Sequence, residues 1–203
     1  MKLLKLTLVL LFAMTANLAY SQIGVRAGVN IATQSVDEGD DPGSIIGLNL
    51  GLLYELVLTD NLSIQPEIHF IQKGSKEDFD GFFGSGELSL RLNYLELAVM
   101  GKLNILDIGD HGGLYLGVTP YLGYGLSGES KFEINGDSET EDVDFDDDEI
   151  NRMDYGVGFG VGASYGRLFL DVRYNLGLSN FDDSALDIDI KNRGILIGLG
   201  YKF

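Results

Sequence analysis

The stretch Lys191-Asn-Arg-Gly-Ile-Leu-Ile-Gly-Leu-Gly-Tyr-Lys-Phe203 has two different faces when it is read with a period of two. From Ile195 the odd positions are apolar, whereas glycine and lysine occupy most of the even ones. A period of two predicts a β-strand. What the apolar face contacts therefore decides the class of protein.

Seven further segments repeat this alternation. They are residues 23–33, 46–56, 62–70, 88–99, 114–126, 153–165 and 168–178, with the eighth strand at 195–203. Their connections run long, short, long, medium, long, short, long, and the longest is 128–152. The pattern predicts an all-β, eight-stranded, antiparallel up-and-down barrel with both termini at one end and every long loop at the other.

Two segments depart from regular alternation. The apolar positions of the segment 88–99 are Leu88, Leu90, Leu92 and Tyr94, and then Leu95, Leu97 and Val99. A change of phase of this kind predicts a β-bulge near Tyr94. Pro66 interrupts the segment 62–70, where proline normally marks an edge or a bulge.

Two kinds of eight-stranded barrel fit this pattern: a soluble ligand-binding barrel and an outer-membrane barrel. The face opposite the apolar one is mostly glycine, asparagine and serine, which is too poor in charge for a solvated surface. Aromatic residues gather near the segment ends, as in the girdles of a lipid-facing wall. They are Tyr54, Phe70, Tyr94, Tyr124, Tyr155, Tyr165, Tyr174, Tyr201 and Phe203. We therefore predict a transmembrane barrel, which must close because lipid offers no hydrogen bonds to an open edge.

Residues 1–21 have the three parts of a secretory signal: Lys2 and Lys5, an apolar run over 6–12, and small residues at Ala19 and Ser21. The run is shorter than the roughly 20 residues of a spanning helix. We predict export, removal of residues 1–21, and a mature barrel domain of residues 22–203 in the outer membrane.

Composition narrows the function. The chain has 31 acidic and 14 basic residues, a formal charge of −17, and no cysteine. This acidity disfavours nucleic acid, which requires a basic patch. The only histidines, His69 and His111, are too few for a typical zinc site, and no spacing indicates a catalytic nucleophile with its base. We expect no enzymatic activity and no cofactor.

Charged residues also occur on the faces that should point inward. They are Arg26, Glu67, His69, Glu96, Lys102, Asp171 and Arg173. These side chains could line a narrow pathway. However, eight strands leave a lumen that side chains fill, and buried charges must pair. A hydrogen-bonded plug is therefore the favoured interpretation.

The segment 137–149 carries nine acidic residues. Hard cations prefer several carboxylate oxygens, so Asp142, Asp144, Asp146 and Asp148 are weak calcium candidates. Asp147 and Met153 stand where an EF-hand loop needs glycine and glutamate. A solvated, mobile loop is the simpler expectation for a block of like charges.

Several short stretches resemble one family. They are Leu62-Ser-Ile-Gln-Pro-Glu-Ile-His-Phe70, Gln72-Lys-Gly74, Leu92-Asn-Tyr-Leu-Glu-Leu97, Pro120-Tyr-Leu-Gly-Tyr124 and Arg173-Tyr-Asn-Leu-Gly-Leu178. Together they are similar to the outer-membrane β-barrel domain of PorT-like, porin-family proteins of Gram-negative bacteria. Ala98 stands where that family usually has proline. The resemblance implies an eight-stranded outer-membrane barrel and no single activity.

Three roles remain open from the sequence. The first is a structural or interaction role for a barrel that displays long acidic extracellular loops, and the alternative is a narrow small-solute channel. A secretion-associated, PorT-like component is a third. The expected partners are outer-membrane lipid, the barrel-assembly machinery and an envelope or surface partner, with a monomer as the default. Tyr201 and Phe203 resemble a C-terminal assembly signal.

Overall fold

The computed structural model describes residues 21–36, 41–81, 84–109, 112–134, 136–145, 150–181 and 189–203. The predicted signal peptide, apart from Ser21, and His111 lie outside these residues, as do Asp146 and Asp148 of the proposed calcium set. Within the described ranges, no helix has the length and apolarity to cross a membrane.

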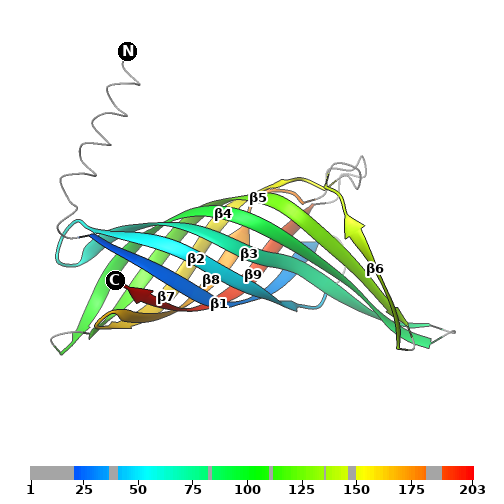
Figure 1. Ribbon diagram of the computed structural model, residues 1–203, viewed down its shortest axis with the longest axis horizontal. Helices are drawn as coiled ribbons and strands as arrows, with labels where there is room; N and C mark the ends of the chain where they lie inside the picture. The colour runs from blue at the N-terminus through cyan, green and yellow to red at the C-terminus, as the bar shows by residue number, and fades with distance from the viewer. Residues whose placement is uncertain are drawn as a thin grey trace, which may run out of the picture.

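Nine antiparallel strands account for almost all of the described chain. They are β1 (Ser21–Val36), β2 (Ile45–Val57), β3 (Leu62–Gly81), β4 (Gly84–Ile108), β5 (Gly112–Ile134), β6 (Asp137–Val143), β7 (Met153–Tyr165), β8 (Leu168–Gly177) and β9 (Ile190–Lys202). All except β6 form a ring in which each strand pairs with two neighbours, and the pairings β1–β9 and β4–β5 close it. The predicted eight-stranded up-and-down barrel is confirmed (Figure 1).

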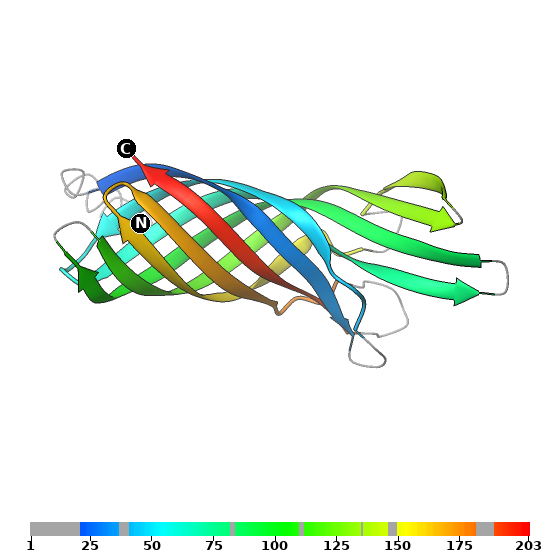
Figure 2. The same cartoon turned by 90° about the horizontal axis from the view of Figure 1, so that it is seen from below.

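The strands of the ring differ in length, and this shapes the molecule. β3 and β4 pair from Leu62↔Leu103 as far as Gly81↔Gly84, and β5 continues to Ile134, where β6 turns back along it. These two hairpins project beyond the other strands at the end opposite Phe203 (Figures 1 and 2). We call this the projecting end, and the other the terminal end.

Much of what the sequence predicted as loop is therefore strand. Residues 71–81 and 84–87 extend the β3–β4 ladder by ordinary antiparallel pairing. Asp137–Val143, part of the predicted mobile acidic loop, forms β6. The turn before β6 contains Gly136 at φ 92°, a left-handed conformation that suits glycine. All seven residues of β6 are exposed or half-exposed, so water screens the repulsion between their carboxylates.

The wall alternates between exposed apolar and buried side chains. The exposed apolar set includes Val25, Val29, Leu48, Leu50, Leu52, Ile68, Leu97, Val99, Val118, Leu122, Val161, Leu170, Val172, Ile197 and Leu199. Large apolar side chains on the outer surface all around a ring are the signature of a wall that faces lipid. The terminal strand behaves as predicted, because Lys202 points inward whereas Leu199 is 58% exposed.

The predicted β-bulge is present, but it lies in the partner strand. The β4–β5 register shifts between Asn93 and Tyr94, as predicted. Opposite this point, Leu126 and Ser127 of β5 are both exposed, so the extra residue belongs to β5. β4 keeps its phase, and Leu92 and Tyr94 are fully buried inside the barrel. The prediction that they face lipid, with Tyr94 in an aromatic girdle, was wrong.

Pro66 lies within the ring. It pairs with Val99 of β4, whereas the β2–β3 ladder is interrupted between Leu53↔Glu67 and Leu56↔Ile64. Proline has no N–H to donate, so a strand can hold it where one of its two ladders is broken. The barrel closes around this irregularity without losing either neighbour.

Candidate functional site

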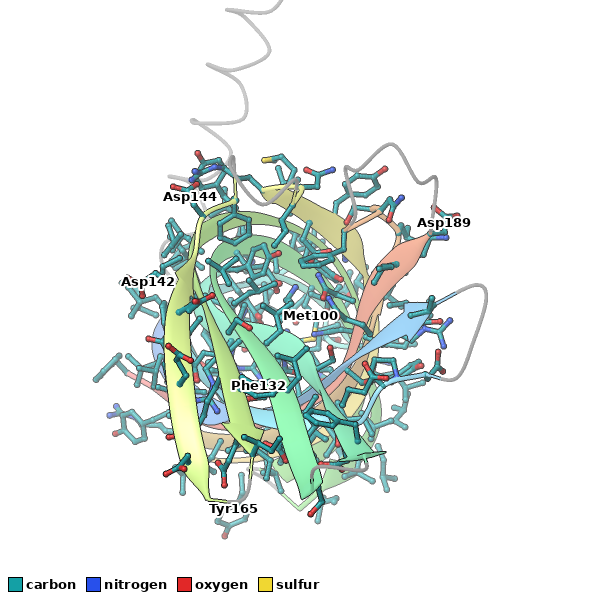
Figure 3. The ribbon with its side chains drawn as sticks, turned by 90° about the vertical axis from the view of Figure 1, so that its right-hand side faces the viewer. Met100, Phe132, Asp142, Asp144, Tyr165 and Asp189 are labelled. Atoms are coloured by element: carbon teal, nitrogen blue, oxygen red, sulfur yellow. The ribbon has the colours of Figure 1, made fainter. Side chains whose placement is uncertain are left out.

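Side chains fill the barrel lumen. Viewed from the projecting end, side chains occupy the interior of the ring, and Met100 lies among them (Figure 3). Their charged members form three ion-paired clusters along the barrel axis. We name these the terminal-side, central and mouth-side clusters, where the mouth is the opening of the barrel at the projecting end.

The central cluster is built around Glu67. Its carboxylate accepts two hydrogen bonds from Arg173, from Nη1 at 2.7 Å and from Nη2 at 2.8 Å. It also accepts from Gln65, from Arg26 at 3.4 Å and from His69 Nε2 at 2.6 Å. The paired guanidinium and carboxylate planes form a bidentate contact, the strongest common geometry for this pair. The side chain of Glu67 is completely inaccessible to solvent.

Asp171 is the second carboxylate of the central cluster. Arg26 Nη2 lies 2.5 Å from Asp171 Oδ1, and Arg173 Nη2 lies 3.2 Å from Oδ2. The Tyr115 hydroxyl donates to the same Oδ2 at 3.3 Å. Two arginines and two acids therefore neutralise one another in a site that water does not reach, as the cost of burying charge requires.

The terminal-side cluster pairs Glu55 with two lysines. Lys102 Nζ donates to Glu55 Oε1 at 2.8 Å, and Lys202 donates to Oε2. Ser63 Oγ adds a third donor at 2.8 Å. Lys102 also lies over the Tyr115 ring, with Nζ 4.3 Å from its centroid, which links this cluster to the central one.

The mouth-side cluster reverses this arrangement, with one lysine between two acids. Lys73 Nζ donates to Glu96 at 2.7 Å and to Asp154 at 2.6 Å. Its ammonium group lies 4.2 Å from the centroid of the Tyr121 ring. Ser179 Oγ donates to Asp154 at 2.9 Å. The three clusters carry formal charges of +1, 0 and −1 from the terminal end to the mouth, so their five cations and five carboxylates cancel.

An apolar group, which we call the apolar cap, fills the lumen beside the mouth-side cluster. It consists of Ile71, Leu92, Tyr94, Phe145 and Leu196, all at most 3% exposed. Phe145 reaches it from the connection between β6 and β7 and meets the Tyr94 ring edge-on at 5.9 Å. Gly125 makes room, because a Cβ there would lie 2.4 Å from Phe145 Cζ. Apolar side chains therefore close the lumen together with the ion-paired clusters.

Backbone hydrogen bonds hold the connections over the cap. The amide of Ile150 donates to the Phe145 carbonyl at 3.1 Å, and the amide of Asn151 donates to the Phe181 carbonyl at 2.9 Å. Phe181 in turn donates to Ile190 at 2.7 Å. The ends of the β6–β7 and β8–β9 connections are thus joined to each other and to β9.

The structure brings together most of the side chains that the sequence placed in the lumen. The central cluster contains five of them: Arg26, Glu67, His69, Asp171 and Arg173. Glu96 belongs to the mouth-side cluster. Lys73 and Asp154 also lie in the lumen, although they were not among the predicted residues. Lys73 could have been found, because it continues the odd-numbered inward positions of Glu67 and His69 beyond the predicted end of that strand.

The calcium candidates are only partly described. Asp142 lies in β6, and Asp144 follows it, 3.6 Å from Arg152. Both lie on one side of the mouth, and Asp189 lies on the opposite side (Figure 3). Among the described residues, no group of three or more acids and histidines is placed to hold a metal ion.

The projecting hairpins carry different residues on their two faces. On one face Lys76 Nζ donates to Glu87 at 2.7 Å, and this hydrogen bond raises the pKa of Lys76. On the other face the rings of Phe79 and Phe132 stack with centroids 5.6 Å apart. Phe132 is 42% exposed, so an apolar surface is displayed beyond the lipid-facing part of the wall.

Comparison with known proteins places this barrel. A family model described as "Outer membrane protein beta-barrel domain" matches residues 12–183. The chain belongs to this family. An outer-membrane location accompanies that membership, whereas the narrower resemblance to PorT-like proteins stays a prediction. Comparison with curated proteins finds no match.

Solved outer-membrane proteins resemble this family member at low identity. Ail, the attachment invasion locus protein of Yersinia pestis, is 16% identical over 90% of this chain and 99% of its own, with a TM-score of 0.46. Neisserial surface protein A is 14% identical over 89% and 97%, with a TM-score of 0.47. OprG from Pseudomonas aeruginosa is 16% identical over 90% and 95%, with a TM-score of 0.45.

Proposed function

We propose that this outer-membrane barrel is a closed structural and interaction protein whose role is carried by its projecting end, which faces the cell exterior. The observation that carries the proposal is the filled lumen. Three ion-paired clusters, whose charges cancel when they are taken together, and the apolar cap occupy it. A solute would have to separate paired buried charges, each costly to expose alone in a low-dielectric site. A narrow small-solute channel is therefore the less favoured role.

The proposal includes the remaining features of the chain. Residues 1–21 direct export, and the barrel acts as a monomer in outer-membrane lipid without a reaction to catalyse. Tyr201 and Phe203 serve the barrel-assembly machinery. The exposure of Phe203 supports this role, because 64% of the residue is accessible. Its ring centroid lies 5.5 Å from that of Tyr201. Weak calcium binding by Asp142, Asp144, Asp146 and Asp148 stays a prediction.

Planar-bilayer recording tests the closed lumen. Purified protein should give no discrete conductance steps under conditions in which a general porin gives them. A shortened variant in which a tight turn replaces residues 130–141 keeps Phe145 and the apolar cap. It should be equally silent while losing capture of envelope or surface partners from intact outer membranes. Stable single-channel steps from the unaltered protein would contradict the proposal.

A further inference from the structure

A hollow of about 600 Å³ opens at the projecting end, between the β3–β4 hairpin and the ends of β1 and β9. Its described lining includes Gln34, Val36, Glu77, Leu88, Leu90 and Ile190. Volumes of this size hold small ligands or short peptide segments. The hollow lies outside the filled lumen, so a ligand could reach it without entering the barrel.

The hollow has an apolar side. Leu88 is 42% exposed, and Leu90 packs against the apolar cap with part of its surface free. Val36 and Ile190 are partners in the β1–β9 ladder and are both half-buried. Leu88 also pairs with Phe132, which extends the apolar surface along the hairpins. This surface can bury the side chain of an apolar residue.

A polar side chain with an unused donor lies beside it. Gln34 is 6% exposed, and its Oε1 accepts from Ser75 Oγ at 2.7 Å. Its Nε2 has no hydrogen-bond partner. A buried amide without an acceptor is unfavourable, because it has lost its water without replacement. A ligand with a carbonyl oxygen would supply that acceptor.

The charge of the hollow is negative. Asp41, Glu77 and Asp78 line it together with one cation, Lys76. Lys76 is already occupied by Glu87, and it lies 3.7 Å from Asp78. Glu77 is exposed and forms no ion pair with the described residues. Anionic lipid head groups and nucleic acids are repelled here, whereas a cationic group is attracted.

We propose that this hollow binds a cationic amphipathic peptide segment. An apolar side chain packs on Leu88 and Leu90, a neighbouring lysine or arginine lies against Glu77 and Asp41, and a backbone carbonyl accepts from Gln34. A peptide supplies all three groups at adjacent positions. The inference rests on the proposed interaction role and names the chemistry of the partner.

The test uses the full barrel in nanodiscs of zwitterionic phosphatidylcholine. The probe is a dye-labelled, N-acetylated hexapeptide of alternating leucine and lysine, read by fluorescence polarisation and corrected for empty nanodiscs. Two control peptides replace lysine by glutamate or leucine by serine. We expect saturable binding of the first peptide only, weakened in about 1 M salt, where the Debye length falls to about 3 Å.

Variants locate the binding. Leu88→Ser should weaken it about tenfold or more, because most of the apolar contact is lost. Glu77→Gln should weaken it about two- to fivefold and reduce its salt dependence. Glu129→Gln is the matched control, since Glu129 is exposed on the opposite face of the hairpins. It should leave the affinity unchanged.

Three results would overturn the inference: equal binding of the glutamate peptide, binding no stronger than to empty nanodiscs, or unchanged affinity in both Leu88→Ser and Glu77→Gln. Bilayer recording is independent of all three. A silent bilayer without peptide binding rejects only this hollow as the binding site, whereas conductance steps reject the closed lumen itself.

Discussion

Replacement of Glu67 by glutamine removes one charge from the centre of the lumen and almost no volume. In the central cluster, Glu67 and Asp171 balance Arg26 and Arg173, so the variant leaves one positive charge without a counterpart. Arg173 loses a bidentate contact with bonds of 2.7 and 2.8 Å. The new amide also directs an N–H toward donors that previously shared a carboxylate.

Removing one partner of a buried ion pair costs about 3–5 kcal/mol, because the other charge stays desolvated. With an m value of about 2 kcal/mol per molar urea, a loss of about 4 kcal/mol lowers the unfolding midpoint by about 2 M. The measurement is equilibrium unfolding of the barrel in phosphatidylcholine vesicles, followed by circular dichroism. Glu133→Gln, which breaks an exposed pair with Lys131 on the projecting hairpin, is the control and should not move the midpoint.

The double variant Glu67→Gln with Arg173→Met tests whether charge balance is the cause, because it should reverse part of the destabilisation caused by Glu67→Gln alone. It leaves one arginine and one acid, Arg26 and Asp171, already joined at 2.5 Å. Charge balance is then restored, so the double variant should unfold at higher urea than Glu67→Gln alone. If the two substitutions instead add, or if Glu67→Gln has the midpoint of the unaltered barrel, the central cluster does not depend on charge neutrality.

Three further outcomes are expected. Gly125→Ala forces Phe145 out of the apolar cap and should lower the free energy of unfolding by roughly 1–3 kcal/mol, with new protease cleavage near the Phe145 ring. Gly101→Ala is the control, because its Cβ would meet nothing closer than 3.8 Å, and it should match the parent in both assays. Phe203→Ala should unfold in urea like the parent but accumulate in the periplasm of expressing cells, and normal assembly would contradict its signalling role. Glu87→Gln should lower the raised pKa of Lys76, as seen by NMR of its ammonium group. The ion pair between Lys76 and Glu87 stabilises the fold below the unfolded pKa of Lys76, and this stabilisation is lost as pH rises through the folded pKa. An unchanged titration of Lys76 in the variant would contradict the hydrogen bond.

Alternation alone was enough to predict the barrel, because lipid imposes one apolar face on every strand of the ring. It was misleading where the inside of the barrel is apolar too. Leu92 and Tyr94 satisfy the same pattern as lipid-facing residues, yet they belong to the apolar cap. A period of two identifies the two faces of a strand. It cannot say which face points outward where both the lipid and the lumen are lined by apolar side chains.

Strand lengths were harder to predict than strand positions. Beyond the lipid, strands need no apolar face, so the signal that marks them ends while the ladder continues. Lys73 was missed for this reason, and so was the pairing of β5 with β6. The sequence Asn135-Gly136 is a strong hairpin signal and would have predicted the β5–β6 turn, but the surrounding block of acids favoured a loop.

The cancellation of charge inside the lumen fixes where the acidity of the chain is expressed. Five cations and five carboxylates neutralise one another in the three clusters, so the formal charge of −17 belongs entirely to residues outside them. The outward wall is apolar where it faces lipid, which leaves the two ends of the barrel as the places for that charge. β6 and the hollow beside Glu77 lie at the projecting end. A concentrated negative field there raises the encounter rate with basic partners and falls within a Debye length of about 8 Å at physiological salt. For the proposed cationic peptide, selection would then come from short-range contacts with the apolar side chain of Leu88 and with the Gln34 amide, whose Nε2 has no hydrogen-bond partner.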